Sequence, residues 1–231
     1  TWMPEIYGSI IEKIRALAPE LILCVSLSGR HIRDHEKREA PHELDGDLKP
    51  DMGSLTLSST NFNREASVNA PDTIKGLAAI MKERGIVPEL EAFDAGMINY
   101  AKYLEAKGLL EAPHYFNLLL GNIACAQADL LHLGVMIRDL PDSSCWAVAG
   151  IGDAQLKMNS MAIAAGGGVR VGLEDNIWLD AGRTKLARNI DLVERVHVLV
   201  EANDRKVMSP AELRRKLNLR PGKGQYGRAG P

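Results

Sequence analysis

Short β-rich runs alternate along the chain with segments whose apolar residues recur at helical spacing. The runs predict six strands, at residues 21–28, 52–59, 87–94, 114–121, 144–152 and 168–175. Helices are predicted at residues 71–84 and 127–138, and a further helix over residues 4–17 precedes the first strand. Strands separated by helices indicate βα units and a parallel sheet within one domain.

Most of these strands alternate between an apolar face and a polar face. In the third run Glu89 and Glu91 share one face, while Leu90 and Ala92 share the other. The first, second and last runs alternate in the same way, with polar positions at Ser26, Ser28, Ser54, Thr56, Ser58, Arg170 and Glu174. A doubly wound sheet would need apolar residues on both faces, whereas a closed barrel can turn one face toward a polar interior. The alternation therefore favours a (β/α)₈ TIM barrel.

The number of strands falls short of a complete barrel. Such a barrel has eight strands and about 250 residues, whereas this chain has 231 residues and six predicted strands. We therefore expect a single TIM-barrel domain over residues 1–231 that lacks its first two strands and one helix, and is open along one seam. Ser209 and Pro210 predict a capped helix within residues 209–231, followed by a flexible tail.

The composition excludes several classes of protein. With a net charge of −2 and mixed signs throughout, the chain is a poor candidate for nucleic-acid or membrane-surface binding. No apolar run approaches the roughly 18 residues of a membrane span, and no secretory signal is visible. The three cysteines, Cys24, Cys125 and Cys145, each lie in or beside an apolar run. They predict buried, reduced thiols in a cytoplasmic protein.

The last predicted strand places charges on the face that would line the barrel. Charges inside a barrel cost several kcal/mol unless they are paired, hydrogen-bonded or bound to metal. Four residues of strand span about 13 Å, so we expect Arg170 and Glu174 to have separate partners. Asp175 could pair with Arg170 if the chain bends there. Carboxylates around one arginine suit metal binding and proton abstraction beside a carbonyl, and a structural ion-pair network is the alternative interpretation.

The chain resembles the β-keto acid cleavage enzymes, of which the 3-keto-5-aminohexanoate cleavage type of lysine fermentation is the best studied. The similar segments read VSLSGR, KPDMGSLTLSSTNF, PELEAFDAGM, WAVAGIG and GGGVRVGLEDN, in the family's order. Together they extend over essentially the whole chain. The resemblance implies a zinc-dependent (β/α)₈ barrel that converts a β-keto acid and acetyl-CoA into acetoacetate and a new acyl-CoA.

The resemblance also implies roles for individual residues. Glu174 corresponds to a zinc ligand, Asp175 to the acid/base group and Arg170 to the electrostatic partner of that group. The other implied site residues are a further carboxylate (Glu91), two contacts to the carboxylate end of the keto acid (Ser26 and Gly29) and another substrate contact (Ser54).

Part of the family's pattern does not occur in this chain. The other two zinc ligands of the family are histidines in an H-x-H motif at the end of the second strand. None of the six histidines here forms such a motif, and a substrate-recognising group of the first strand is also missing. Both belong to the segment expected upstream of Thr1.

Three interpretations of the chain follow. It is an N-terminally truncated β-keto acid cleavage enzyme, a non-catalytic barrel remnant unable to hold zinc, or another metal-dependent lyase or aldolase on the same barrel. Under the first, the resemblance implies a homo-oligomer, because members of the family commonly assemble.

Overall fold

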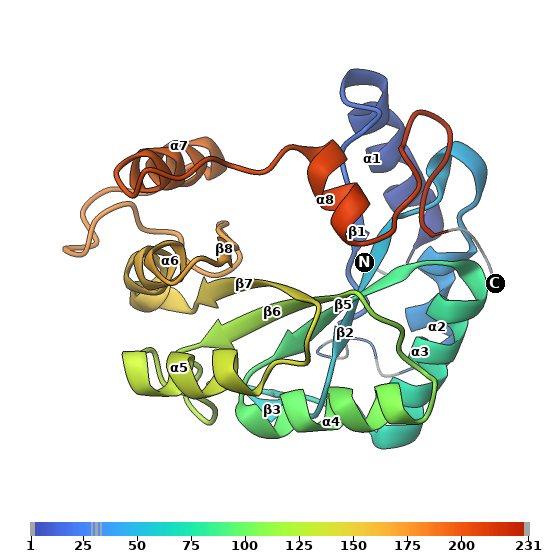
Figure 1. The fold of residues 1–231 in the computed structure, drawn as a ribbon, viewed down its shortest axis with the longest axis horizontal. Helices are drawn as coiled ribbons and strands as arrows, with labels where there is room; N and C mark the ends of the chain where they lie inside the picture. Colours follow the sequence, from blue (N-terminus) through green and yellow to red (C-terminus); the bar gives the residue numbers. More distant parts are fainter. Residues whose placement is uncertain (1–2, 29, 31, 33, 229–231) are drawn as a thin grey trace.

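Six strands form one parallel sheet in the computed structural model, which describes residues 3–228 except residues 29, 31 and 33 and the side chains of residues 35 and 36. The strands are β1 (Cys24–Val25), β2 (Met52–Thr56), β5 (Val87–Ala92), β6 (His114–Leu120), β7 (Ser144–Gly150) and β8 (Gly168–Val169). They pair in the order β1-β2-β5-β6-β7-β8, so that β1 and β8 are the two edges. The sheet curls into a parallel half-barrel (Figure 1), which confirms the α/β class.

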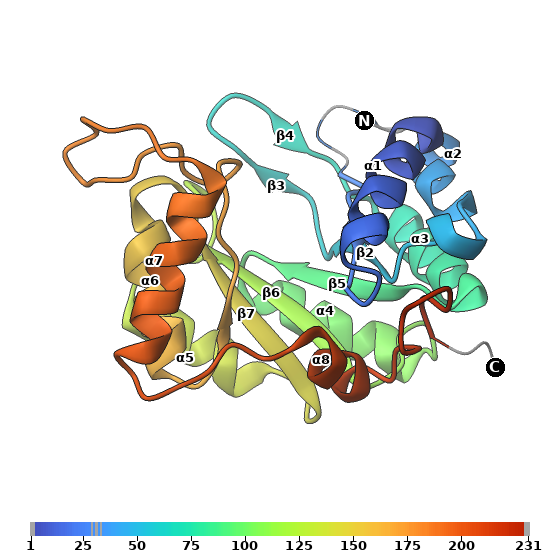
Figure 2. The ribbon, with the colours of Figure 1, turned by 90° about the horizontal axis from the view of Figure 1, so that it is seen from above.

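Helices pack around the outside of the curled sheet (Figures 1 and 2). They are α3 (Pro71–Arg84), α4 (Ala95–Ala106), α5 (Leu130–Asp139) and α6 (Gln155–Ala164). The chain begins with α1 (Pro4–Leu17) and ends with α7 (Asn189–Glu201) and α8 (Pro210–Lys216). The remaining elements are short: α2 (His35–Glu39), η1 (Ala40–Glu43), η2 (Gly46–Leu48), η3 (Gly152–Ala154) and a hairpin of β3 (Thr60–Asn61) and β4 (Ala66–Ser67).

The apolar face of the sheet forms the main core with the surrounding helices. Leu90, Phe116 and Val148 of three neighbouring strands are at most 1% exposed, and Leu77 of α3 and Ile98 of α4 belong to the same cluster. Burial of this face is the main stabilising contribution, because each large apolar side chain removed from water contributes about 1.5–3 kcal/mol. The polar face is consequently left to line the concave side.

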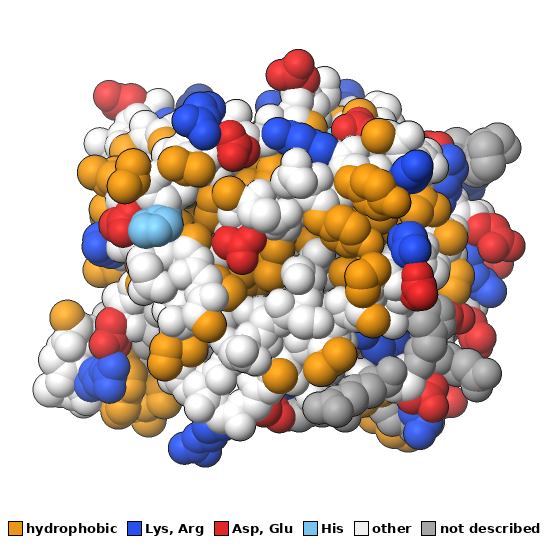
Figure 3. Space-filling model, turned by 90° about the horizontal axis from the view of Figure 1, so that it is seen from below, with side chains coloured by type: hydrophobic (Ala, Val, Ile, Leu, Met, Phe, Trp, Pro, Cys, Tyr) orange, Lys and Arg blue, Asp and Glu red, His pale blue; other side chains and the backbone are white. Residues whose placement is uncertain are grey.

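The outer surface of α4 and α5 faces away from the sheet. Apolar side chains lie between charged ones on this side of the molecule (Figure 3). Tyr103 of α4 and Leu130 and Leu131 of α5 are exposed. No helix of the described residues has both the length and the hydropathy needed to cross a membrane.

Helix α8 and the residues after it pack against the N-terminal ends of β2 and β5. Leu217 and Leu219 form a second apolar cluster with Met52 and Val87, the first residues of β2 and β5. The Ser209 side chain accepts a hydrogen bond from the Glu212 N–H, so the predicted cap at the start of this helix is confirmed. Beyond the helix, Tyr226 is 4% exposed. Flexibility of the tail stays a prediction, and this packing argues against it.

Expectations about the length of the edge strands and the burial of the cysteines are wrong. The first strand covers only Cys24–Val25 of the predicted residues 21–28. The last strand ends at Val169 instead of continuing to residue 175, because the chain turns there. The cysteines are free, but Cys24 is exposed and both Cys125 and Cys145 are only half-buried. Cys24 lies on the edge strand β1, which pairs on one side only among the described residues, so its environment is more open than the sequence suggests.

Candidate active site

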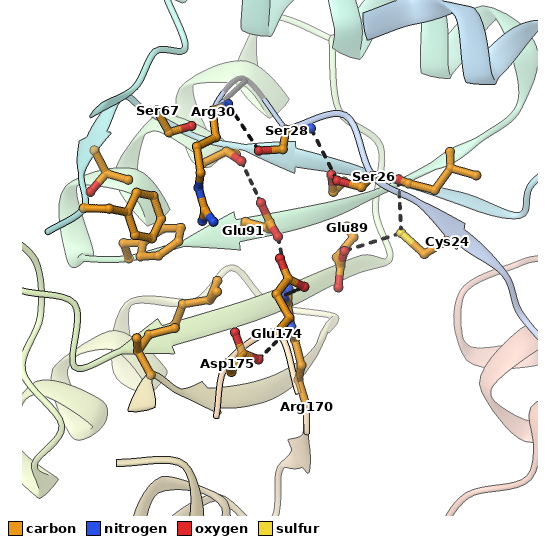
Figure 4. Close-up of a pocket in the computed structure, with 18 residues that line it drawn as sticks. Cys24, Ser26, Ser28, Arg30, Ser67, Glu89, Glu91, Arg170, Glu174 and Asp175 are labelled. Atoms are coloured by element: carbon orange, nitrogen blue, oxygen red, sulfur yellow. Dashed lines mark hydrogen bonds and ion pairs between the residues drawn. The ribbon is translucent and has the colours of Figure 1, made fainter. Parts of the chain in front are cut away.

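A cavity of about 330 Å³ lies on the concave side of the sheet, where the strands end (Figure 4). Parallel strands direct their C-terminal ends to the same rim, which is where barrel enzymes gather functional groups. The structure brings six of the predicted residues to this cavity, namely Ser26, Ser54, Glu91, Arg170, Glu174 and Asp175. The seventh, Gly29, lies outside the described residues.

Arg170 connects three carboxylates in this cavity. Its Nη1 lies 3.1 Å from Glu91 Oε1, its Nη2 lies 2.9 Å from Glu174 Oε2, and its Nε lies 3.3 Å from Asp175 Oδ2. The expectation that Arg170 and Glu174 are too far apart to pair is therefore wrong, because the chain between them is not a strand. The expected bend that lets Asp175 reach Arg170 is present.

A turn held from two sides produces that bend. The N–H groups of Asp175 and Asn176 both donate to the Gly172 carbonyl, each at 3.2 Å. Gln155, fully buried at the start of α6, donates from its side chain to the same carbonyl at 3.1 Å. The Gly152 N–H donates to the Asp175 carbonyl at 2.7 Å. The backbone that carries Asp175 is thus fixed by groups outside the turn.

The backbone of Arg170 is fixed in a similar way. Its N–H donates to the Val148 carbonyl of β7 at 3.0 Å. Asn159 of α6 is 1% exposed and donates from its amide to the carbonyls of Val148 and Arg170, at 3.1 and 3.2 Å. A rigid support of this kind keeps a functional side chain in one position.

Burial and mutual charge shift the pKa values of these groups. Removal of Asp175 from water raises the pKa of its carboxyl, even though Arg170 opposes the change. Burial and the neighbouring Glu89 raise the pKa of Glu91, against hydrogen bonds from Thr56 and Arg170. Burial would lower the pKa of Arg170, but the carboxylates around it, with Asp175 the strongest, raise it overall. Arg170 stays charged, while Asp175 takes up a proton more readily than an ordinary aspartate.

Several residues around this cluster carry no role in the sequence analysis. Thr56 donates from its hydroxyl to Glu91 at 2.6 Å, and Asn117 of β6 donates to Glu89 at 2.8 Å. The alternation of polar and apolar residues along the strands predicts that Thr56 and Glu89 point to the concave side. It does not predict their hydrogen-bond partners. Arg30 also lines the cavity, and the only signal for it is that a cation follows the SLSG segment.

Two serine hydroxyls stand near the carboxylate cluster. Ser54 Oγ accepts a hydrogen bond from the Leu27 N–H at 2.9 Å, and Ser26 Oγ accepts one from the Ser28 N–H at 3.4 Å. Each contact uses an oxygen lone pair, so each hydroxyl keeps its hydrogen for donation to a ligand. This arrangement suits an anionic group such as a carboxylate.

The residues described here do not make a zinc site by themselves. Glu174 has a side chain that is 71% exposed, and its carboxylate is engaged by Arg170. Within the described part of the chain, no three histidine, cysteine, aspartate or glutamate side chains are grouped so that they could hold a metal ion. Zinc sites in proteins need three or four such ligands, so Glu174 alone does not satisfy the requirement.

A curled parallel sheet whose strand ends carry a buried carboxylate–arginine cluster defines an enzyme site of the TIM-barrel type. Comparison of the sequence with known families agrees: residues 1–219 match the sequence pattern of the beta-keto acid cleavage enzymes. The chain belongs to that family.

Characterised relatives extend over most of the chain. A 3-keto-5-aminohexanoate cleavage enzyme of Fusobacterium nucleatum subsp. nucleatum is 37% identical over 218 residues, which are 94% of this chain and 77% of that protein. A 3-oxoadipate:acetyl-CoA acetyltransferase of Cupriavidus necator is 36% identical over 94% of this chain and 75% of its own length.

Solved structures show the same fold. The binary complex of ObcA with oxaloacetate superimposes with a TM-score of 0.79 at 19% identity, and the apo structure of ObcA with a TM-score of 0.75, also at 19% identity. Each match covers 94% of this chain. The chain spans 56% of the oxaloacetate complex and 55% of the apo structure, so it matches little more than half of ObcA.

Proposed function

We propose that the protein is a zinc-dependent β-keto acid cleavage enzyme that converts a β-keto acid and acetyl-CoA into acetoacetate and a new acyl-CoA. The observation that carries the proposal is the buried Asp175 beside Arg170 at the strand ends in a chain of this family. The names of the relatives, which include an acetyl-CoA acetyltransferase and a keto acid cleavage enzyme, support a carbon–carbon cleaving acyl transfer.

The overall reaction transfers a carboxymethyl group. The bond between C2 and C3 of the keto acid and the thioester bond of acetyl-CoA break. C2 joins the acetyl carbonyl carbon, and the CoA sulfur released from that carbon joins the former ketone carbon. The C2 protons are acidified by the adjacent ketone, so a carboxylate poised beside C2 can remove one of them. Asp175 is the proposed base, since its pKa is raised by burial. Arg170 holds Asp175 in place and offsets charge during the transfer.

Ser26 and Gly29 are proposed to bind the carboxylate of the keto acid, and Ser54 to make a further substrate contact. Both serine hydroxyls retain a hydrogen to donate and line the cavity with Asp175. Glu91 is held by Thr56 and Arg170, and its proposed role is to keep Arg170 oriented toward the reacting atoms. Correct placement of the substrate carboxylate fixes C2 relative to the base, which is how such contacts raise the rate.

Zinc and the two absent strands belong to the same proposal. Glu174 would supply one ligand, and the resemblance places two histidines in a segment upstream of Thr1. That segment would pair with the exposed edges of β1 and β8 and complete the barrel. A homo-oligomer is the expected state by resemblance, and the cytoplasmic location is expected from the reduced cysteines. When bound, zinc would stabilise negative charge on the keto oxygen.

The test is an assay of the full-length protein with acetyl-CoA and a panel of β-keto acids. Formation of acetoacetate together with a new CoA thioester is the expected result. Retro-aldol cleavage without thioester exchange would instead establish another metal-dependent lyase. A full-length protein that neither binds zinc nor turns over any keto acid would be the non-catalytic barrel remnant.

A further inference from the structure

Arg30 extends into the cavity from the loop that follows β1 (Figure 4). Its backbone N–H donates to Ser28 Oγ at 3.3 Å. Its side-chain Nε is buried, and no acceptor for that N–H exists among the described residues. A buried donor without an acceptor costs about 1–3 kcal/mol, so a ligand that supplies an acceptor here gains by satisfying it.

The ring of Phe62 stacks on the guanidinium of Arg30, and a second ring, that of Phe93, supports Phe62. The Cζ of Arg30 lies 4.1 Å from the centroid of the Phe62 ring, which belongs to the β3–β4 hairpin. Phe62 in turn meets Phe93 edge-to-face, with ring centroids 5.8 Å apart, and Phe93 is 4% exposed. Stacking on a ring occupies the flat face of the guanidinium and leaves its edge free to form the paired hydrogen bonds that carboxylates accept.

The other arginine of the cavity is not available for a ligand's charge. Arg170 is already paired with three carboxylates. The lining carries four acidic side chains, Glu89, Glu91, Glu174 and Asp175. Within the described lining, Arg30 is therefore the cation that an anionic group can pair with.

The Arg30 guanidinium lies away from Ser26, one of the residues proposed to bind the reacting end of the substrate (Figure 4). In Figure 4 the guanidinium of Arg30 points into the cavity, and Glu91 lies between it and Ser26 in this view. Ser26 belongs to the group proposed for the carboxylate next to C2. The guanidinium therefore faces a different part of a bound keto acid.

We propose that Arg30 is a specificity-determining residue that binds a second carboxylate, remote from the ketone, and that the substrate is a dicarboxylic β-keto acid. That such an acid is cleaved rests on the proposed function, whereas the binding of a dicarboxylate at Arg30 does not. The two are therefore tested separately.

Binding is measured by calorimetry on the full-length protein with two unreactive probes of equal chain length, hexanedioate and hexanoate. The wild type is expected to bind the dicarboxylate at least about tenfold more tightly, and Arg30→Gln to abolish that difference while leaving hexanoate binding within about twofold. The control is Arg64→Gln, an exposed residue in the same hairpin as Phe62, which should change neither affinity. Equal binding of both probes by the wild type, or equal weakening of both by Arg30→Gln, would overturn the proposal.

Turnover is measured with β-keto acids of matched length whose far end is anionic, neutral or cationic. Arg30→Gln should lower kcat/KM for the anionic member by about 10²-fold and leave the neutral member within about threefold. A uniform loss, or an increase in the KM for acetyl-CoA alone, would contradict the proposal. Arg30 would then contact a group that all the reactions share, such as the reacting end of the keto acid or acetyl-CoA. If the wild type turns over no keto acid, the proposed function fails and the calorimetry still decides the role of Arg30.

Discussion

The Nε atom of Arg170 lies 3.3 Å from Oδ2 of Asp175, a carboxylate whose side chain is 6% exposed. This contact joins a permanently charged group to a carboxyl that burial makes more basic. The two residues are five positions apart, and they meet because the chain turns at Gly172. A carboxyl of raised pKa that is held by a cation and supported by a fixed turn is suited to the proposed removal and return of one proton.

Asp175→Asn is expected to lower turnover by about 10²–10⁴-fold, since the amide keeps the shape of the side chain but cannot accept the proton. The measurement is kcat of the full-length protein with acetyl-CoA and its preferred keto acid, with bound zinc determined in the same preparation. Asp153→Asn is the matched control, because Asp153 is an exposed residue paired with Arg183. Near-normal turnover by Asp175→Asn with zinc retained would remove Asp175 from the proposed role.

Glu174→Ala is expected to abolish zinc binding in the full-length protein, because one of three protein ligands would be lost. Elemental analysis of purified variants gives the zinc content directly. Glu194→Ala, at an exposed position of α7, should retain full occupancy. Undiminished zinc in Glu174→Ala would show that Glu174 serves only as the exposed partner of Arg170.

The alternation of polar and apolar residues predicted where the site would be. Glu89 and Glu91 project to the concave side because Leu90 and Ala92 occupy the buried face. A period of two assigns a face to every residue of a strand, so the polar interior follows from the sequence once the strands are located.

The end of the last strand could not be predicted in the same way. The pattern of residues 168–175 alternates as a strand would, yet the chain turns after Val169. The groups that hold the turn, Gln155 and Asn159, belong to α6. Hydrogen bonds between segments distant in sequence leave no periodic signal in either segment. The turn cannot therefore be predicted from the pattern of residues 168–175, and neither can the pairing of Arg170 with Glu174 that depends on it.

Arg214→Ala should lower the free energy of unfolding by about 3–5 kcal/mol, because it removes the hydrogen-bonded cation of the buried Asp51 carboxylate and leaves only Arg15, at 3.6 Å, to oppose its charge. Arg214 is 2% exposed and pairs with the fully buried Asp51 at 2.8 Å and 2.9 Å. This pair joins α8 to the residue before β2. Denaturant unfolding gives the value, and Arg215→Ala, the exposed neighbour on the same helix, should change it by less than about 0.5 kcal/mol. Equal effects of the two substitutions would show that the buried pair contributes no more than surface charge.

His42 should make the fold sensitive to acid. It is 1% exposed, and neither ring nitrogen has a hydrogen-bond partner among the described residues. Burial, helped by the charge of Arg84, lowers the pKa of His42 from 6.5 to about 4. Between these values the unfolded chain binds a proton at this position and the folded chain does not. The free energy of unfolding should therefore fall as the pH drops below 6.5, by about 3 kcal/mol in total near pH 4.

The measurement is denaturant unfolding at pH 7, 5.5 and 4.5 for the wild type and for His42→Leu, which replaces the titrating ring with an apolar side chain. Because the variant has no proton to gain at this site, its stability should change less between pH 7 and 4.5 than that of the wild type. His197→Gln, at an exposed position of α7, should keep the wild-type dependence. If His42→Leu loses stability with falling pH as steeply as the wild type does, His42 does not cause the acid sensitivity, because the slope with pH counts only the protons taken up on unfolding.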